Sequence, residues 1–365
     1  MSRCKECGKV SGEVAKVLGV CGECVQGADE ELLKKFGEIH KGSREEFGLA
    51  GRAVSDAGGA ACGLCQNECV IGEGRRGYCG VRRNEKGHIT GGTAKGAAVS
   101  WYYDALPTNC VADWVCAGGS SAGYPEWSYC EGAEHGYVNL AVFYEACTFD
   151  CLFCQNWHYR RRSLKDRMRS ARELADSVSS NTACICYFGG DPTAQLPHAL
   201  AAARLARRQN ERRILRICWE TNGSMSGRLL DEMMRLSLES GGCVKFDLKA
   251  MDENLHLALC GVSNERTKEN FAAAAGRIGG RPEPPPLVAS TLLVPGYVEV
   301  EEVGAIASFI ADLDCNIPYA LLGFHGDFLM RDLPATSRRQ AEDCFAAAEA
   351  AGLRRVRIGN VHILR

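Results

Sequence analysis

Three cysteines in one short loop give the clearest chemical signal in this chain. Cys147, Cys151 and Cys154 have the spacing C-x3-C-x2-C, and the loop offers no fourth cysteine. A cubane iron–sulfur cluster has four irons and usually takes four cysteine ligands. Three thiolates leave one iron open for a substrate, by the same logic that separates open catalytic metal sites from closed structural ones. The alternative is a closed cluster or a zinc site that takes its fourth ligand from a distant cysteine.

This spacing, with Phe153 just before the last cysteine, resembles the motif of the radical S-adenosylmethionine (SAM) family. The resemblance implies that the three cysteines hold a [4Fe-4S] cluster and that SAM chelates the open iron. It also implies reductive cleavage of SAM to a 5′-deoxyadenosyl radical, which abstracts hydrogen from a substrate. In that family the aromatic residue at the position of Phe153 lies near the SAM adenine.

Apolar runs alternate with helical patterns from about residue 137 onward. The runs rich in Val, Ile, Leu, Phe, Tyr and Cys cover 138–145, 184–188, 214–219, 243–248, 287–294 and 317–323. The helical patterns lie near 170–180, 195–210, 226–240, 252–278, 299–313 and 336–351. This alternation predicts βα units and a parallel sheet. We therefore expect an α/β fold, an incomplete (β/α)6 TIM-like barrel preceded by small Cys-rich metal-binding modules.

Unusual polar motifs follow each of the six predicted strands. They are the cysteine loop, Gly189-Gly190-Asp191, Glu220-Thr221-Asn222, Asp247-Leu248-Lys249, Val294-Pro295-Gly296 and Gly323-Phe324-His325. The carboxyl ends of barrel strands form the face on which such folds place their chemistry. The collection of all six motifs on this face favours an enzyme.

Two of these motifs are candidates for binding SAM. Gly189-Gly190-Asp191 resembles the GGE motif of the family, with Asp191 in place of the usual glutamate, and its glycines let backbone carbonyls approach the SAM ammonium group. The alternative is a strand-to-helix turn in which Asp191 is an N-cap. Glu220, Thr221 and Asn222 offer hydrogen-bond donors and acceptors for the methionyl carboxylate or the ribose.

Asp247, Lys249 and His325 are the candidate catalytic residues. Asp247 and Lys249 either bind the substrate or the SAM carboxylate, or form an internal salt bridge across the barrel mouth. His325 either donates a proton or positions the substrate, or it is a structural histidine.

Further segments narrow the resemblance within the family. Asp247-Leu248-Lys249 and Val294-Pro295-Gly296 are similar to the strand ends of glycyl-radical-enzyme activases such as pyruvate formate-lyase activating enzyme. A related branch, which includes the radical SAM protein of the AmmeMemoRadiSam gene set, is more similar still. The segments that support this second resemblance are Cys154-Gln155-Asn156-Trp157, Cys260-Gly261-Val262-Ser263-Asn264-Glu265-Arg266, Cys62-Gly63-Leu64-Cys65 and Gly77-Tyr78-Cys79-Gly80-Val81-Arg82. Residues 1–40 and 101–136 depart from that branch.

The first 136 residues are rich in glycine, cysteine and charged residues, with a helical pattern only near 29–41. Cysteine pairs at positions 4, 7 and 21, 24 have the spacing of a four-thiolate zinc ribbon, and a labile iron–sulfur site is the alternative. A ribbon this small cannot bury a core, so the metal would supply its folding energy. The predicted ligands are Cys4, Cys7, Cys21 and Cys24.

Two further cysteine sets have open assignments. Zinc and a structural iron–sulfur cluster fit equally well for Cys62, Cys65, Cys69 and Cys79. Another set either ligates an auxiliary cluster with a remote fourth ligand or consists of buried thiols in an aromatic lid; its members are Cys110, Cys116 and Cys130. Cysteines within apolar runs are expected to be buried free thiols, and these are Cys184, Cys186, Cys218 and Cys243.

Length and composition limit the class of protein. The chain has 365 residues, room for a barrel-sized domain and smaller units, which we place at 1–45, 46–136 and 137–365. Its 21 cysteines come without a secretion signal, which argues against a disulfide scaffold. A net charge of -2 gives no global attraction to nucleic acid or an anionic membrane, and no apolar run is long enough to span a bilayer. We expect a cytoplasmic protein.

A basic stretch follows the cysteine loop. It is either a solvated face or a docking site for an acidic electron donor such as flavodoxin or ferredoxin, or for an anionic substrate. Its members are Arg160, Arg161, Arg162, Lys165, Arg167, Arg169 and Arg172.

Three hypotheses for the function follow from the sequence. The first is an activase that places a radical on a glycine of a partner protein. The second is radical SAM modification of a small molecule, a peptide or RNA with the help of an auxiliary cluster. The third is a non-catalytic metal-binding or electron-transfer adaptor, which would not bind SAM.

Overall fold

A computed structural model describes residues 1–108, 110–162 and 168–365. In this part of the chain the main sheet has nine strands in the order β15-β14-β13-β12-β11-β10-β8-β7-β9. Seven of the strands are parallel neighbours in chain order, as in an open barrel. They are β8 (Val138–Tyr144), β10 (Thr182–Gly189), β11 (Arg216–Thr221), β12 (Val244–Asp247), β13 (Leu287–Leu293), β14 (Tyr319–Gly323) and β15 (Val356–Gly359).

The predicted α/β class and the six predicted strands are confirmed, and the sheet extends beyond them at both edges. β15 adds a seventh parallel strand on one side. On the other side β7 (Ala97–Ala105) pairs antiparallel with β8, and the short β9 (Met168–Arg169) pairs with β7. The proposed domain boundaries at 45 and 136 remain a prediction, and β7 brings part of 46–136 into the main sheet.

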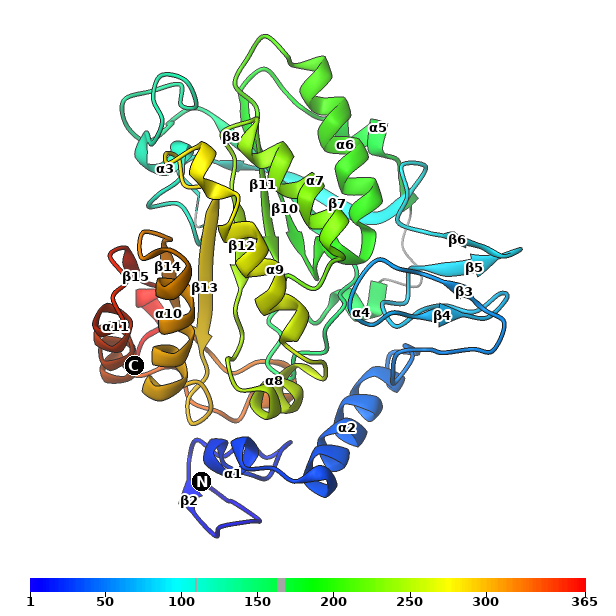
Figure 1. Ribbon diagram of the computed structural model, residues 1–365, viewed down its shortest axis with the longest axis vertical. Helices are drawn as coiled ribbons and strands as arrows, with labels where there is room; N and C mark the ends of the chain where they lie inside the picture. The colour runs from blue at the N-terminus through cyan, green and yellow to red at the C-terminus, as the bar shows by residue number, and fades with distance from the viewer. Residues whose placement is uncertain (109, 163–167) are drawn as a thin grey trace.

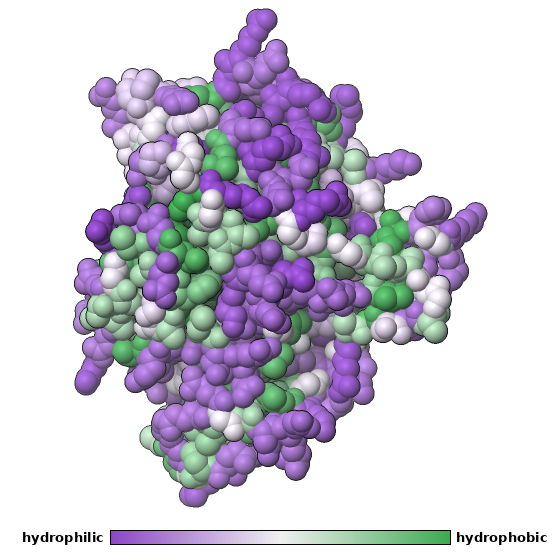
Figure 2. Space-filling model, in the orientation of Figure 1, coloured by the Kyte–Doolittle hydropathy of each residue, from purple (hydrophilic) through white to green (hydrophobic). Residues whose placement is uncertain are grey.

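Helices cover the outer face of this sheet, where Figure 1 shows α6, α7, α9 and α10 next to one another. Hydrophilic side chains cover most of the surface over α6 and α7, so these helices bury only their inner faces (Figure 2). The helices that follow β8 are α4 (Tyr159–Arg162), α5 (Ala171–Ala175), α6 (Leu196–Gln209), α7 (Gly227–Leu238), α8 (Glu253–Cys260), α9 (Glu265–Ala275), α10 (Val300–Asp314) and α11 (Arg338–Ala350), with 3-10 turns η1 (Pro192–Gln195), η2 (Ile278–Gly280), η3 (Phe328–Met330) and η4 (Val361–Ile363).

The helical stretch predicted near 252–278 is divided into two helices in the structure. α8 ends at Cys260, and Gly261 follows in the left-handed conformation at φ 73°. A Cβ atom at this position would approach Nδ1 of His40 to 2.8 Å. Gly261 therefore serves as a helix C-cap and also makes room for a side chain of the amino-terminal region.

The amino-terminal region packs against the end of the barrel at which the parallel strands finish (Figure 1). The Tyr297 hydroxyl donates to the Val20 carbonyl at 2.8 Å and accepts from the Ala15 N–H at 2.9 Å. Asp29 caps the first long helix by accepting from the Leu32 N–H. The elements before β8 are β1 (Ser2–Arg3), β2 (Val10–Ser11), α1 (Gly22–Gln26), α2 (Glu30–Glu45), β3 (Ala60–Ala61), β4 (Val70–Ile71), β5 (Arg83–Glu85), β6 (His88–Thr90), β7 and α3 (Ala117–Ser120).

In the part of the chain that the structure describes, no helix is both long and apolar enough to cross a membrane.

Candidate functional site

A cavity of about 190 Å³ lies at the carboxyl ends of the first parallel strands. The three cysteines of the loop after β8 line it, together with the motifs after β10, β11 and β12. The structure thus brings together nearly all of the residues that the sequence placed at this face. The predicted residues that line the cavity are Cys147, Cys151, Phe153, Cys154, Gly189, Gly190, Asp191, Glu220, Thr221, Asn222, Asp247 and Lys249.

A buried carboxylate holds the cysteine loop in place. Asp150, between the first two cysteines, has no exposed surface and forms an ion pair with Arg160. Its second oxygen lies 2.8 Å from Nδ1 of His40, and Arg44 lies 3.7 Å away. His40 and Arg44 both come from α2. The conformation of the loop therefore depends on a helix more than a hundred residues earlier in the chain.

The charges around Asp150 decide its protonation state. Burial alone would raise the pKa of this carboxyl group, but the hydrogen bond from His40 and the positive charge of Arg160 outweigh it and lower the pKa below 3.8. Asp150 is therefore an anion at neutral pH. The backbone N–H groups of Asp150 and Leu152 donate to the carbonyls of Cys260 and Leu259, both at 2.9 Å, which ties the loop to the end of α8.

The environment of the loop sulfurs suits a bound metal cluster. Burial raises the pKa of the Cys147 thiol strongly and that of Cys154 to about 12, so free thiolates are disfavoured there. A metal ion reverses this preference because it binds thiolates. The Phe149 N–H (3.4 Å) and the Asn222 side-chain amide (3.7 Å) point at the Cys147 sulfur as donors. These features fit the three-cysteine iron–sulfur site expected from the sequence.

A fourth thiol lies close to the loop. The sulfur of Cys260 is 3.6 Å from that of Cys151, and this hydrogen bond lowers the pKa of Cys151. Cys260 has no exposed surface and is not among the residues that line the cavity. It therefore contacts Cys151 from behind, which leaves the cavity side of the loop with three cysteines.

Asp191 joins the two motifs that were assigned to SAM binding. One carboxylate oxygen accepts from the N–H of Thr193 at 2.7 Å, as expected of the N-cap of η1. The other oxygen accepts from the Asn222 N–H at 2.6 Å and the Thr221 hydroxyl at 3.1 Å. Burial raises the pKa of Asp191 to about 6. Both carboxylate oxygens are thus used within the protein, so Asp191 positions the loop after β11.

The two glycines before Asp191 allow close packing against the end of β8. Gly189 has φ 118°, and a Cβ atom there would lie 2.4 Å from the Tyr144 nitrogen. A Cβ atom on Gly190 would lie 2.2 Å from the Ala146 carbonyl oxygen. Any larger residue would therefore push this turn away from the cysteine loop.

Two ion pairs involve residues that line the cavity, Asp247 with Lys249 and Glu220 with Lys245, of which only Lys245 does not line it. Nζ of Lys249 lies 2.8 Å from Asp247, so the internal salt bridge, one of the two alternatives for this pair, is present. Glu220 pairs at 2.9 Å with Lys245, whose side chain is only 2% exposed. Lys245 comes from β12 and was not identified from the sequence, although a lysine inside an apolar strand is an unusual residue type for that position.

His325 lies apart from this arrangement. Its side chain is exposed and is not among the residues lining the cavity, so no contact in the described structure links it to the cluster loop. Its proposed catalytic role stays an untested prediction.

The basic stretch after the loop is not a continuous surface in the described residues. Arg160 is 1% exposed and bonded to Asp150, which makes it part of the loop support and not of a docking face. Arg169 and Arg172 pair with Glu173 and Asp176 one turn later. Lys165 and Arg167 lie outside the described residues.

The structure also brings together two cysteine sets of the amino-terminal half. The ligand atoms of Cys4, Cys7, Cys21 and Cys24 all lie within 4.8 Å of one another, so the structure brings the four predicted ligands together. Among the described residues this is the one group of three or more potential ligands that is so compact. The second set also lines one small pocket, together with Thr148 of the cysteine loop; its members are Cys62, Cys65, Cys69 and Cys79.

Comparison with known proteins agrees with this geometry. Residues 141–310 match the model of the Radical SAM superfamily. The isethionate sulfite-lyase activating enzyme of Oleidesulfovibrio alaskensis is 33% identical over 142 residues, 39% of this chain and 41% of that protein. The uncharacterized protein MJ0808 of Methanocaldococcus jannaschii is 24% identical over 306 residues, which cover 82% of this chain and 81% of that protein.

Among solved structures, the chain is similar to a domain of a pyruvate-formate lyase-activating enzyme from Bacteroides vulgatus. It is 22% identical with a TM-score of 0.39, over 48% of this chain and 98% of that domain. The match to the activating enzyme of Oleidesulfovibrio alaskensis spans less than half of that relative's length. The match to the family model covers the cysteine loop and the strands β10 to β13. Residues 141–310 of this chain therefore form a radical SAM domain.

Proposed function

We propose that this protein is a radical SAM enzyme whose cluster is held by Cys147, Cys151 and Cys154. The observation that supports this most directly is the convergence of the three thiols and the two motifs predicted to bind SAM on one cavity. When bound, such a cluster supplies the electron for reductive cleavage of SAM to methionine and a 5′-deoxyadenosyl radical, which abstracts hydrogen from the substrate. The reaction is expected to need an external one-electron donor such as flavodoxin or ferredoxin.

Each group around the cavity has a role in this proposal. Phe153 offers an apolar face for the adenine, and Glu220 offers a carboxylate for ribose hydroxyls; both line the cavity. Asn222 spans the site, because its side-chain amide donates to the Thr148 hydroxyl at 2.8 Å and points at the Cys147 sulfur. Lys249, 16% exposed at the cavity wall, is the cation available to a carboxylate of SAM or substrate. Closure of the mouth by a substrate would exclude water and oxygen.

The favoured substrate is a partner protein, modified in an activase-like reaction. The relatives with an assigned name are activating enzymes, and the strand ends Asp247-Leu248-Lys249 and Val294-Pro295-Gly296 resemble theirs. The alternative, modification of a small molecule, peptide or RNA with an auxiliary cluster, is supported by the additional cysteine sets. A glycine radical on a co-expressed partner would favour the first.

The experiment that tests the proposed function is electron paramagnetic resonance of the reduced, anaerobically purified protein with and without SAM. SAM is expected to change the signal of the loop cluster, and dithionite with SAM is expected to yield 5′-deoxyadenosine. The variant Cys154→Ala should lose both effects, whereas Cys344→Ala should keep them, because Cys344 is a buried thiol of α11 remote from the loop. An unperturbed signal together with no SAM cleavage would support the non-catalytic adaptor instead.

Zinc is the ion proposed for the first cysteine set. A tetrahedral zinc with Zn–S bonds of about 2.3 Å places its sulfurs about 3.8 Å apart. The sulfurs of Cys7 and Cys21 are 3.7 Å apart, and all four ligand atoms lie within 4.8 Å. The ligand atoms of the second set do not form so compact a group, and in this they are like the cysteines of the loop, for which a cluster is proposed. An iron–sulfur cluster is therefore also proposed for the second set, Cys62, Cys65, Cys69 and Cys79.

Loss of the first metal is expected to unfold the segment that it joins. The double variant Cys4→Ser/Cys21→Ser should lose about one zinc per chain and become sensitive to proteases within residues 5–20, since the four cysteines join the two ends of this segment. Zinc analysis and limited proteolysis measure both effects. Cys315→Ser is the matched control, because this half-buried thiol lies at the end of α10. Full zinc content in the double variant would show that these thiols are not ligands.

A further inference from the structure

A second cavity, of about 40 Å³, lies inside the barrel near the opposite ends of the strands. Four cysteines of apolar runs, expected from the sequence to be buried free thiols, share it with two cysteines of the segment after β7. Cys130, which was grouped with those two, is not among its lining residues. The six cysteines that line the cavity are Cys110, Cys116, Cys184, Cys186, Cys218 and Cys243.

A buried lysine lies among these sulfurs. Nζ of Lys245 is 3.0 Å from the Cys186 sulfur, 3.1 Å from the Cys110 sulfur and 2.9 Å from Glu220. A neutral thiol is a weak acceptor, and a buried ammonium group is costly unless its donors are satisfied. Glu220 balances the charge of this ammonium group, and its other two contacts are with the sulfurs of Cys110 and Cys186. Thiolate ligands of a metal centre would accept these two hydrogen bonds more strongly than neutral thiols.

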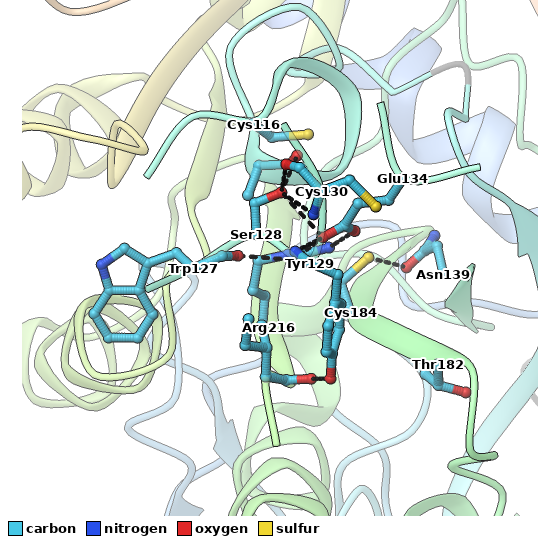
Figure 3. A network of polar contacts seen from close by, with 12 residues as sticks. Cys116, Trp127, Ser128, Tyr129, Cys130, Glu134, Asn139, Thr182, Cys184 and Arg216 are labelled. Carbon is cyan, nitrogen blue, oxygen red and sulfur yellow. Dashed lines mark hydrogen bonds and ion pairs between the residues drawn. The ribbon is translucent and has the colours of Figure 1, made fainter. Parts of the chain in front are cut away.

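The six thiols fall into two groups by their contacts. Cys184 donates to the side-chain oxygen of Asn139 at 3.4 Å, as Figure 3 shows, and Cys116 donates to the Asp113 carbonyl at 3.8 Å. Cys110 also donates to an oxygen, that of Glu220 at 3.5 Å, so the groups are separated by contact with Lys245 or with another cysteine of the cavity, which Cys184 and Cys116 lack. The sulfurs of Cys110 and Cys186 contact Lys245. The thiols of Cys218 and Cys243 form a hydrogen bond with each other. Four cysteines remain, the number that an iron–sulfur cluster takes.

Two cations line the cavity, and each is paired with a carboxylate, Lys245 with Glu220 and Arg216 with Glu134. A four-thiolate centre is anionic, and donors from nearby cations lower the cost of burying it. Arg216 is 2% exposed and forms a two-point ion pair with Glu134 (Figure 3), so its guanidinium group is held in a fixed position at the cavity wall.

We propose that Cys110, Cys186, Cys218 and Cys243 ligate an additional iron–sulfur cluster inside the barrel. Thiolate-only sites select zinc, Cu(I) or iron–sulfur clusters. These sulfurs do not form a group within 4.8 Å, as the first cysteine set does, which favours a cluster of several irons over a single zinc.

This site borders the cavity of the cysteine loop. Oε1 of Glu220 lies 3.5 Å from the Cys110 sulfur and 4.0 Å from the Cys186 sulfur, and Glu220 also lines the loop cavity. The additional cluster would thus lie on the far side of Glu220 from the SAM site. Its presence does not depend on SAM cleavage.

The test compares two double variants of the same cavity after anaerobic purification of the full chain. Cys218→Ala/Cys243→Ala is expected to lose at least about two irons per chain with as much acid-labile sulfide. Cys116→Ala/Cys184→Ala removes the two non-ligand thiols and is expected to keep the iron content of the unmodified protein. The signal change on adding SAM should persist in both variants, which separates this proposal from the proposed function.

Equal iron content in the unmodified protein and both variants would overturn the proposal. If the first variant does not fold, the metal content of the unmodified protein decides. If one zinc per chain is found, it is assigned to the first set, and the loop and the second set together account for at most about eight irons. If two zincs are found, the second zinc is assigned to the second set, and the loop alone accounts for about four irons. Iron above that ceiling supports the additional cluster, and iron at or below it contradicts the cluster.

Discussion

Replacement of Asp150 by asparagine is expected to lower the free energy of unfolding by about 3–5 kcal/mol and to empty the loop of its cluster. The side chain keeps its size, but Arg160 and Arg44, both 1% exposed, lose the carboxylate that balances them. Breaking a buried ion pair from one side costs this much because a charge is left uncompensated. Urea denaturation of the metal-free protein and iron analysis of the anaerobic protein measure the two effects.

The pH dependence of this variant distinguishes lost charge from lost shape. The pKa of Asp150 is held below 3.8 in the folded protein, so the carboxylate stabilises the fold above about pH 4. This stabilisation disappears as the pH falls through the folded pKa. The difference in stability between the unmodified protein and Asp150→Asn should therefore narrow in acid. Asp176→Asn, at an exposed ion pair with Arg172, is the control and should change stability by less than about 1 kcal/mol.

Glu134→Gln is expected to have an effect of similar size, about 3–5 kcal/mol, at the other end of the barrel. Glu134 is fully buried and accepts from both terminal nitrogens of Arg216 and from the Tyr129 N–H at 2.9 Å. These bonds join the segment between β7 and β8 to β11, as Figure 3 shows. A neutral amide would leave the guanidinium group charged and buried.

Unfolding in urea with the anaerobic apoprotein measures this cost. The control is Asp231→Asn, which breaks an exposed ion pair in which the side chain of Arg277 is 39% exposed and that of Asp231 is 53% exposed. This change should lower the free energy of unfolding by less than about 1 kcal/mol. An effect of Glu134→Gln as small as that of the control would show that water or a local shift solvates Arg216, contrary to its burial.

The sequence predicted the parallel strands because each one is a long apolar run, and it predicted the site because polar motifs end those runs. β15 was missed, since Val-Arg-Ile-Gly is short and only partly buried. β7 was missed because its outer half, with Tyr102 and Tyr103, faces solvent and lacks an apolar run. The break at Gly261 left a local signal, a glycine at a helix C-cap, that was not used, whereas the room that it makes for His40 cannot be predicted from a local pattern.

For the site residues, too, local patterns were informative, whereas contacts between distant segments could not be predicted. The support of Asp150 by His40 and Arg44 joins positions about a hundred residues apart, and no spacing rule indicates it. The grouping of cysteines inside the barrel did leave a signal. Cys184 and Cys186 are two apart in one strand, which places both side chains on one face. Had this alternation been combined with Lys245 in β12, the shared cavity would have been a prediction of the sequence.

The helix α2 has a consequence for the insertion of metals. It supplies His40 and Arg44 to the cysteine loop, and it follows directly on the segment that holds Cys4 to Cys24. Tyr297 and Gly261 contact this region at the barrel mouth, so a metal held by the proposed amino-terminal ligands would also stabilise the helix that shapes the loop. Under the proposed assignments, a shortage of the amino-terminal ion would therefore lower the incorporation of iron at the loop, and the supply of one metal would affect the use of another.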